Sequence, residues 1–308
     1  MKEALMISQQ AASLTQQFIQ TISKLRKLSP RTLREYQSDM RHFMHWLEKE
    51  FPVHTPIRME KLLPSTIHSY RTTMQETMGL KPATINRRLI TLKQFFEWAH
   101  SEAIVKRDPS LTVKLIPEEK TSPRQITDAE EETLLAAVLQ HGSVRDQTIM
   151  LVMLSTGLRP MEVCNLLLED ILIQGSGNAL NVREGLRHKS RHVPLTSPCV
   201  EQLEKYVSIL PPDSDYLFGS EKTGSRLSER ALRHLVQKYT KAAGLEGLRA
   251  HDLRHRFGYV MAACTSLPYL SQIMGHDSVN TTMLYYRPGY EQPEPAHVEG
   301  ALAVAQSD

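Results

Sequence analysis

Two histidines and an arginine fall close together in the segment HDLRHR, residues 251–256. His251 and His255 are four residues apart with an acid after the first, which is close to the spacing of the H-E-x-x-H zinc motif. Arg254 follows His251 by three residues, so in a helix the two side chains share a face. A guanidinium fork beside an imidazole also suits a phosphate group. The segment therefore indicates either a zinc site or an anion site.

The zinc interpretation has three weaknesses. Asp252 is one methylene shorter than the glutamate of the zinc motif. Arg254 places a permanent positive charge beside the dication, and the pattern does not identify a third ligand. We therefore favour the anion site, with no metal and no cofactor, and keep a zinc hydrolase as an alternative.

A phosphate that is to be cleaved needs more than one cation, and the segment LSTGLRPMEVCNL supplies a second candidate. Arg159 stands between a glycine that ends one helix and Pro160, which begins another. Such a tight junction holds the arginine in place. The alternative is a solvated arginine at a helix terminus.

The segment GHDSVNTTMLYY brings an imidazole and two phenols near the C-terminus. His276 follows a glycine at a turn, and Ser278 is suited to cap a helix that carries Tyr285 and Tyr286. An activated phenol forms an ester with phosphate. A buried tyrosine with a hydrogen-bonded hydroxyl is the structural alternative.

The elements that must position these residues fall into two parts. Apolar stripes at helical spacing predict four helices in the first part, and no strand pattern interrupts them. These helices span about 7–27, 30–50, 64–79 and 81–103. The second part is mixed, with helices and a β-hairpin in which LNVREG and RHVPLT flank the loop LRHKS. The fold class is mainly α with a small β-sheet.

The charge is divided unevenly between the two parts. Residues 1–110 hold 17 Lys and Arg against 10 Asp and Glu, and the remainder holds 20 against 24. A basic first part indicates contact with a polyanion, and a solvated helical surface is the alternative. The side chains that we expect to reach DNA are Arg31, Thr32, Arg34, Lys81, Thr84, Asn86, Arg87, Arg88 and Lys93.

The boundaries and the compartment follow from composition. Three prolines between Asp108 and Pro123 indicate a linker, which we place at 111–124, and a tail follows at 291–308. Three cysteines without C-x-x-C spacing favour a reduced, cytoplasmic protein. The sequence has neither an apolar run of about 18 residues nor a signal-peptide pattern, so no membrane contact is expected.

Taken in order, these motifs resemble the tyrosine recombinase (phage-integrase-like) family. An arginine in TGLRP, a basic hairpin, H-x-x-R, G-H and a tyrosine nine residues later follow one another along the chain. The resemblance implies a helical core-binding (SAM-like) DNA-binding domain at 1–110 and an α+β catalytic domain at 125–290. It implies a site-specific recombinase that cleaves and rejoins DNA through a 3′-phosphotyrosyl intermediate.

Carried over residue by residue, the resemblance also assigns roles. Arg159 and Arg254 would clamp the scissile phosphate, and His276 would hydrogen-bond one of its oxygens. His251 would accept the proton of the nucleophile, which would be Tyr285.

Three further positions follow from the same comparison. Glu162, three residues after the first clamp arginine, would support it, and Tyr286 is a rival nucleophile at the wrong spacing. Relatives carry a catalytic lysine eight residues before the proline of V-P-L, where this chain has Leu186. We therefore assign Lys189 in the hairpin loop as the donor of a proton to the leaving oxygen, because a lysine can release one.

The resemblance also indicates the type of recombinase and its partners. The predicted helices begin close to Met1, which leaves no room for an arm-binding domain and favours a Xer-type or transposon-encoded recombinase or resolvase. The partner is double-stranded DNA with an inverted-repeat core site, bound by a homotetramer on two duplexes. The tail is a candidate for docking on a neighbouring subunit. A topoisomerase-like nicking enzyme and a non-catalytic DNA-binding regulator are the alternatives.

Overall fold

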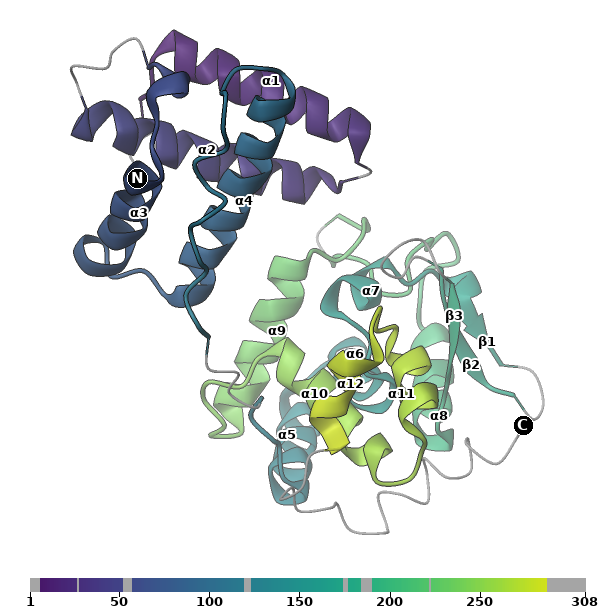
Figure 1. The fold of residues 1–308 in the computed structure, drawn as a ribbon. Helices are drawn as coiled ribbons and strands as arrows, with labels where there is room; N and C mark the ends of the chain where they lie inside the picture. The colour runs from purple at the N-terminus through teal and green to yellow at the C-terminus, as the bar shows by residue number, and fades with distance from the viewer. Residues whose placement is uncertain are drawn as a thin grey trace. The chain divides into compact units, whose positions relative to one another are not determined.

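The computed structural model describes residues 6–26, 28–51, 57–118, 123–173, 177–183, 190–221 and 223–286. Over these residues the chain is mainly helical with one small antiparallel sheet, as the sequence predicts (Figure 1). It divides into two compact units, Met1–Lys120 and Thr121–Asp308. Among the described helices, none has the length and apolar character needed to cross a membrane.

The first unit is built from four helices that lie close to their predicted positions. They are α1 (Gln9–Leu25), α2 (Pro30–Glu50), α3 (Pro64–Thr72) and α4 (Pro82–Ser101). The side chain of Ser29 accepts a hydrogen bond from the backbone of Thr32 and so caps α2, and proline occupies the first turn of α2, α3 and α4. A π-helical turn, Thr73–Thr77, continues α3.

Aromatic side chains hold these helices together. Phe43 of α2 meets the Tyr70 ring of α3 edge-on, with 5.1 Å between centroids. Phe18 of α1 meets the Phe95 ring of α4 in the same way at 5.5 Å. All four rings are fully buried, so they form the core that fixes the helices.

The first residues of the predicted linker pack against this unit. Val113 is buried. The Asn86 amide of α4 donates to the backbone carbonyl of Ile116 at 2.8 Å and accepts from its N–H at 2.8 Å. These contacts attach residues 113–116 to α4.

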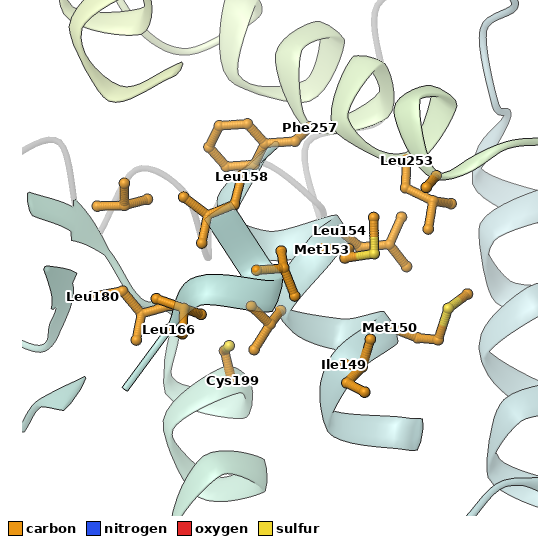
Figure 2. Close-up of a cluster of buried hydrophobic side chains, with 14 of the residues drawn as sticks. Ile149, Met150, Met153, Leu154, Leu158, Leu166, Leu180, Cys199, Leu253 and Phe257 are labelled. Atoms are coloured by element: carbon orange, nitrogen blue, oxygen red, sulfur yellow. The ribbon is translucent and has the colours of Figure 1, made fainter. Parts of the chain in front are cut away.

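The second unit has helices α5 to α12 around one apolar core. Their bounds are α5 (Asp128–His141), α6 (Val144–Thr156), α7 (Pro160–Asn165), α8 (Ser197–Val207), α9 (Glu229–Ala242), α10 (Ala250–Ala262), α11 (Leu267–Met274) and α12 (Val279–Thr282). Figure 2 shows Met150 and Met153 of α6 near Leu253 of α10, with Leu180 and Cys199 in the same cluster. Because α6 runs through this core, it supports α10 and α7, which carry the candidate site.

The predicted hairpin is confirmed. Strand β2 (Ala179–Val182) pairs antiparallel with β3 (Arg191–Pro194), and β1 (Ile171–Leu172) pairs with the other edge of β2. The loop that holds Lys189 and Leu186 lies outside the described residues, as does the tail 291–308.

One helix differs from its prediction. The sequence predicts one helix, capped by Ser278, that carries Tyr285 and Tyr286, but α12 ends at Thr282 and a 3₁₀ turn, Met283–Tyr286, follows. The tighter turn places neighbouring side chains in different directions from those of an α-helix. This determines where the side chains of Tyr285 and Tyr286 point.

Candidate active site

Two arginines that are far apart in sequence are held by consecutive backbone carbonyls. Nη2 of Arg254 donates to the carbonyl oxygen of Met274 at 2.7 Å, and Nη2 of Arg159 donates to that of Gly275 at 2.5 Å. Nη1 of Arg254 also donates to the carbonyl oxygen of Gly157 at 2.5 Å. The C-terminal end of α11 thus brings both guanidinium groups together.

Glycines end the two helices whose last carbonyls accept the hydrogen bonds of the arginines. Gly157 ends α6 and Gly275 ends α11, both in the left-handed conformation with φ of 59° and 63°. The last carbonyls of a helix lack helical partners and carry partial negative charge, so they suit arginine. Space is also limited, because a Cβ on Gly157 would lie 2.3 Å from the Phe257 ring. The motifs TGLRP and MGH therefore place the two arginines.

A buried carboxylate fixes the first arginine. Oε1 of Glu162 accepts from Nη1 of Arg159 at 3.0 Å and from Nη1 of Arg191 at 2.9 Å. Oε2 accepts from Nη2 of Arg191 at 2.8 Å and from the Arg159 backbone N–H at 2.7 Å. Burial acts to raise the pKa of Glu162, but hydrogen bonds and charge from Arg191, helped by Arg159, hold it below the ordinary 4.5.

Arg191 was not among the predicted residues. It begins β3, and its Nε donates to the carbonyl of Ile273 at 2.6 Å, so it joins the hairpin to Glu162 and α11. The signal in the sequence was an arginine at the start of a half-buried strand, which by itself does not identify the partner.

Replacing Glu162 with glutamine should lower the free energy of unfolding by about 3 kcal/mol, because it leaves buried Arg191 without its counter-charge. Urea denaturation measures this. Since the folded pKa of Glu162 is lowered, its contribution is present above pH 4.5 and is lost as the pH falls through the folded pKa, so the difference between the proteins should shrink in acid.

The matched control is Glu169→Gln, because that side chain is 66% exposed and pairs with Arg183 at the surface. It should leave the unfolding free energy unchanged within error. An equal loss in both variants would contradict the role given to Glu162.

The Tyr285 side chain is buried among residues of α10 and the His276 turn. Its ring meets Tyr259 edge-on at 5.1 Å between centroids and stacks on His276 at 6.3 Å. Gly258 makes room for it, because a Cβ there would lie 2.5 Å from Tyr285 Cζ. Burial raises the pKa of Tyr285 to about 12, while the charges of Arg254 and Arg159 act in the opposite direction. The ring thus packs on the residue that follows Gly275, whose carbonyl holds Arg159.

The neighbouring tyrosine points elsewhere. The Tyr286 hydroxyl donates to the backbone carbonyl of Thr265 at 2.8 Å. Tyr285, by contrast, has His255 Nδ1 at 2.9 Å from its hydroxyl oxygen. The 3₁₀ turn thus directs the Tyr285 hydroxyl to His255 of α10 and the Tyr286 hydroxyl to the Thr265 carbonyl.

Replacing Gly258 with alanine should displace the Tyr285 ring. A misplacement of about 1 Å at a reacting group costs on the order of 100-fold in rate, so DNA cleavage should fall by about that factor. Global stability should change little, because alanine is the better helix former and offsets the overpacking. Gly177→Ala is the control, since no atom lies within 4 Å of a Cβ built there. Equal cleavage rates in the two variants would contradict the packing described.

Two imidazoles, of His255 and His276, meet the Tyr285 ring, and a third, of His251, meets the His255 ring. Nδ1 of His276 lies 2.7 Å from the Thr282 hydroxyl oxygen, which orients the ring and leaves Nε2 for another partner. Burial, then the charges of Arg254 and Arg159, lower the pKa of His276 to about 4. The exposed His251 meets the His255 ring edge-on, with 4.8 Å between centroids.

The described residues do not supply a complete set of zinc ligands. No group of three His, Cys, Asp or Glu side chains among them is placed to hold a metal ion. His255 Nδ1 is already directed at the Tyr285 hydroxyl. Of the two histidines in the H-x-x-x-H pair, His255 therefore contacts the phenol, and His251 contacts the His255 ring.

The predicted DNA-contacting residues of the first unit divide into three sets. Arg31, Arg34 and Lys81 are exposed, and Thr32 and Thr84 lie half-buried in the first turns of α2 and α4. These five side chains lie at or near the surface of the unit.

Two others are engaged inside the unit. Asn86 is buried, and besides Ile116 its amide donates to Glu118 Oε1 at 2.6 Å. Nζ of Lys93 donates to the carbonyl of Ser110 at 2.6 Å. Both side chains tie α4 to the segment that follows it.

The last two are anchored by a buried acid. Arg87 Nη1 lies 2.6 Å from Asp39 Oδ2, and Arg88 Nε lies 3.7 Å from Oδ1. Burial raises the pKa of Asp39, and the charges of Arg87 and Arg88 oppose that shift. Arg87 remains 42% exposed, so it is fixed in place with part of its surface open.

The motif analysis did not single out the basic face of α9. Its buried side is apolar, whereas its exposed side carries one sign of charge. The exposed basic residues are Arg230, Arg233, Lys238 and Lys241. The signal was available in ERALRHLVQKYTKA, whose polar positions are mostly basic.

Comparison with known proteins identifies the family. The model named "Phage integrase family" matches residues 124–292, and "Phage integrase, N-terminal SAM-like domain" matches 15–103. A tyrosine recombinase XerC from Thermodesulfovibrio yellowstonii is 30% identical over 83% of this chain and 85% of its own length. XerD from Vibrio cholerae is 26% identical over 97% of this chain and 98% of its own.

Solved structures show the same fold. A lambda integrase tetramer bound to a Holliday junction superposes with a TM-score of 0.72 at 17% identity, covering 92% of this chain and 79% of that one. XerH bound to palindromic difH gives 0.70 at 21%, covering 88% and 80%. The fold class predicted from the sequence, a SAM-like helical domain and a catalytic domain, is confirmed. The chain belongs to the phage integrase family and is a tyrosine-type site-specific DNA recombinase.

Proposed function

We propose that the recombinase cleaves DNA by in-line attack of the Tyr285 oxygen on one phosphodiester held by Arg159 and Arg254. The attack leaves a 3′-phosphotyrosyl link and expels a 5′ hydroxyl. The observation that carries the proposal is the pair of guanidinium groups on the consecutive carbonyls of Met274 and Gly275, with the Tyr285 ring stacked on His276, the next residue.

The arginines supply what this reaction requires. Negative charge on the phosphate oxygens is met by fixed N–H donors in a site that is largely buried, where such groups need no reorganisation. His276, oriented by Thr282, adds a hydrogen bond from Nε2, and His251, which is exposed in the first turn of α10, supplies a further polar group. One ester is exchanged for another, so the reaction needs no cofactor and no external energy source.

The leaving oxygen needs a proton, and we assign Lys189 as its donor. The residue belongs to the hairpin loop between β2 and β3. Arg191, two residues later in the sequence, is tied to Glu162 and therefore to Arg159. This link between the end of the hairpin and the arginine supports the assignment of Lys189.

Duplex DNA is held by the basic surfaces of the two units. In the helical DNA-binding domain, which we place at residues 1–110, we propose contacts from the exposed Arg31, Arg34 and Lys81, with Thr32 and Thr84 beside them. The anchored Arg87 and Arg88 contribute charge, while Asn86 and Lys93 shape the surface from inside. In the catalytic domain, at 125–290, the basic face of α9 makes phosphate contacts. DNA affinity that depends on such phosphate contacts falls steeply as the salt concentration rises.

Recombination joins two duplexes, so we propose a homotetramer on two inverted-repeat core sites in the cytoplasm. The lambda integrase tetramer on a Holliday junction and the Tn1549 transposon integrase, with a TM-score of 0.69, support this assembly and a mobile-element setting. The tail 291–308 is assigned to docking between subunits.

Trapping the covalent intermediate tests this function. A duplex is first selected from a randomised pool by binding to the Tyr285→Phe protein, and is then prepared with a nick at each position in turn. A nick next to the cleaved bond lets the 5′-hydroxyl fragment diffuse away, so the wild-type protein should accumulate a denaturation-resistant adduct. If no nick position gives an adduct with DNA that the protein binds, the proposal is wrong.

A further inference from the structure

We infer that His255, and not His251, takes the proton from the Tyr285 hydroxyl as the strand is cleaved. The inference rests on the proposed function, in which Tyr285 is the nucleophile. His255 follows Arg254 on α10, and its Nδ1 lies 2.9 Å from the Tyr285 hydroxyl oxygen. A proton acceptor must first lie within hydrogen-bond distance of the proton that it removes, and His255 meets that condition before any DNA is bound.

Burial determines the direction of this hydrogen bond. Tyr285 is 5% exposed, so its hydroxyl proton needs an acceptor inside the protein. Burial keeps the phenol protonated, with its pKa raised to about 12. Burial, with the charges of His251 and Arg254, lowers the pKa of His255 to about 4, so its imidazole is neutral at pH 7. The phenol therefore donates to Nδ1, and Nε2 carries the ring hydrogen.

His251 is placed differently. It lies one helical turn before His255, is exposed, and meets the His255 ring edge-on at 4.8 Å between centroids. The described rings that meet Tyr285 are instead those of His255, Tyr259 and His276. On the face that it shares with Arg254, His251 is positioned to hydrogen-bond the phosphate.

The step balances as follows. A bond forms between the Tyr285 oxygen and phosphorus, the bond from phosphorus to the 5′ oxygen breaks, and the phenolic proton moves to His255 Nδ1. The 5′ oxygen receives its proton from a separate donor, the role assigned to Lys189. On rejoining, the 5′ hydroxyl attacks phosphorus and His255 returns its proton to the phenolate. The anionic phosphodiester makes His255 more basic when it enters, because it stabilises the imidazolium.

Single-turnover cleavage of the nicked duplex by His255→Ala and His255→Gln tests the inference. Loss of a positioned base should slow cleavage by at least about 100-fold near neutral pH. Without His255 the solvent must remove the proton, so the variant rate should rise about tenfold per pH unit toward the pKa of the phenol. The wild-type rate should stay nearly flat, and added imidazole should restore part of the His255→Ala rate.

A substrate with sulfur in place of the leaving 5′ oxygen separates the two proton transfers. Sulfur leaves without a proton, so it should rescue a variant that lacks the proton donor but not His255→Ala. His251→Ala is the comparison. Its cleavage rate should be the same fraction of the wild-type rate at every pH. A pH-dependent loss in His251→Ala, or rescue of His255→Ala by sulfur, overturns the inference.

Nitrogen-15 NMR of the intact protein shows which ring nitrogen of His255 carries the hydrogen, without any measurement of activity. At neutral pH the His255 Nδ1 should carry no hydrogen, and a protonated Nδ1 overturns the inference. The proposed function is tested separately from this inference. An adduct that still forms with Tyr285→Phe would contradict the proposed function, whatever the His255 variants show.

Discussion

Tyr285→Phe should abolish the covalent protein–DNA adduct, and Tyr286→Phe should form it at the wild-type rate. The phenylalanine ring still fills the space beside Gly258 and His276, so the fold is preserved and only the nucleophilic oxygen is lost. Removal of a nucleophile costs on the order of 10⁴-fold or more. Denaturing gels of protein bound to the radiolabelled nicked duplex measure the adduct directly.

Tyr286→Phe is the matched control, because it removes a hydroxyl from the adjacent residue. That hydroxyl donates to the Thr265 carbonyl, so its loss affects stability and not the reaction. If Tyr286→Phe loses the adduct while Tyr285→Phe retains it, the assignment of the nucleophile is reversed.

Arg254→Lys should reduce cleavage by on the order of 100-fold or more while the protein keeps its positive charge. Arg254 is 2% exposed, and its fork spans the carbonyls of Gly157 and Met274. An ammonium group cannot span both carbonyls and also present donors to a phosphate, because it is a single point of charge. A transition-state donor of this kind contributes about 10²- to 10³-fold. Single-turnover cleavage at saturating protein separates this loss from weaker DNA binding.

The same helix offers a matched control. Arg256 is also 2% exposed, but it pairs with Asp128 and Glu131 of α5, away from the phenol. Arg256→Lys should lower the free energy of unfolding and leave the cleavage rate within about threefold, because the residue does not touch the phosphate. Equal loss of cleavage in the two lysine variants would show that Arg254 acts only through stability.

Local patterns in the sequence predicted most of the secondary structure. Ser29-Pro30 began α2 where capping chemistry places it, and the alternating segments around 179–194 paired as a hairpin. The order of the arginine, H-x-x-R and tyrosine motifs led, through the family resemblance, to the expectation of one shared site. The capping and strand signals could be recognised in the sequence because each depends on a few neighbouring residues.

Contacts between distant residues were less predictable. The sequence predicts Asn86 as a polar helix residue that contacts DNA, yet its amide is buried and hydrogen-bonds the backbone of Ile116. The sequence predicts that Arg191 lies in a strand, but it does not identify its partner Glu162, which lies 29 positions earlier. His255 was noted only as a possible metal ligand, because its contact with Tyr285 depends on the 3₁₀ turn that replaces the end of a predicted helix. Tertiary packing decides all three.

The structure of the protein on its selected duplex, with vanadate in place of the scissile phosphate, tests the central claim most directly. We predict vanadium bonded to the Tyr285 oxygen, with N–H groups of both Arg159 and Arg254 donating to its equatorial oxygens. Either guanidinium group directed to another phosphate, or a different side chain bonded to vanadium, would contradict the account.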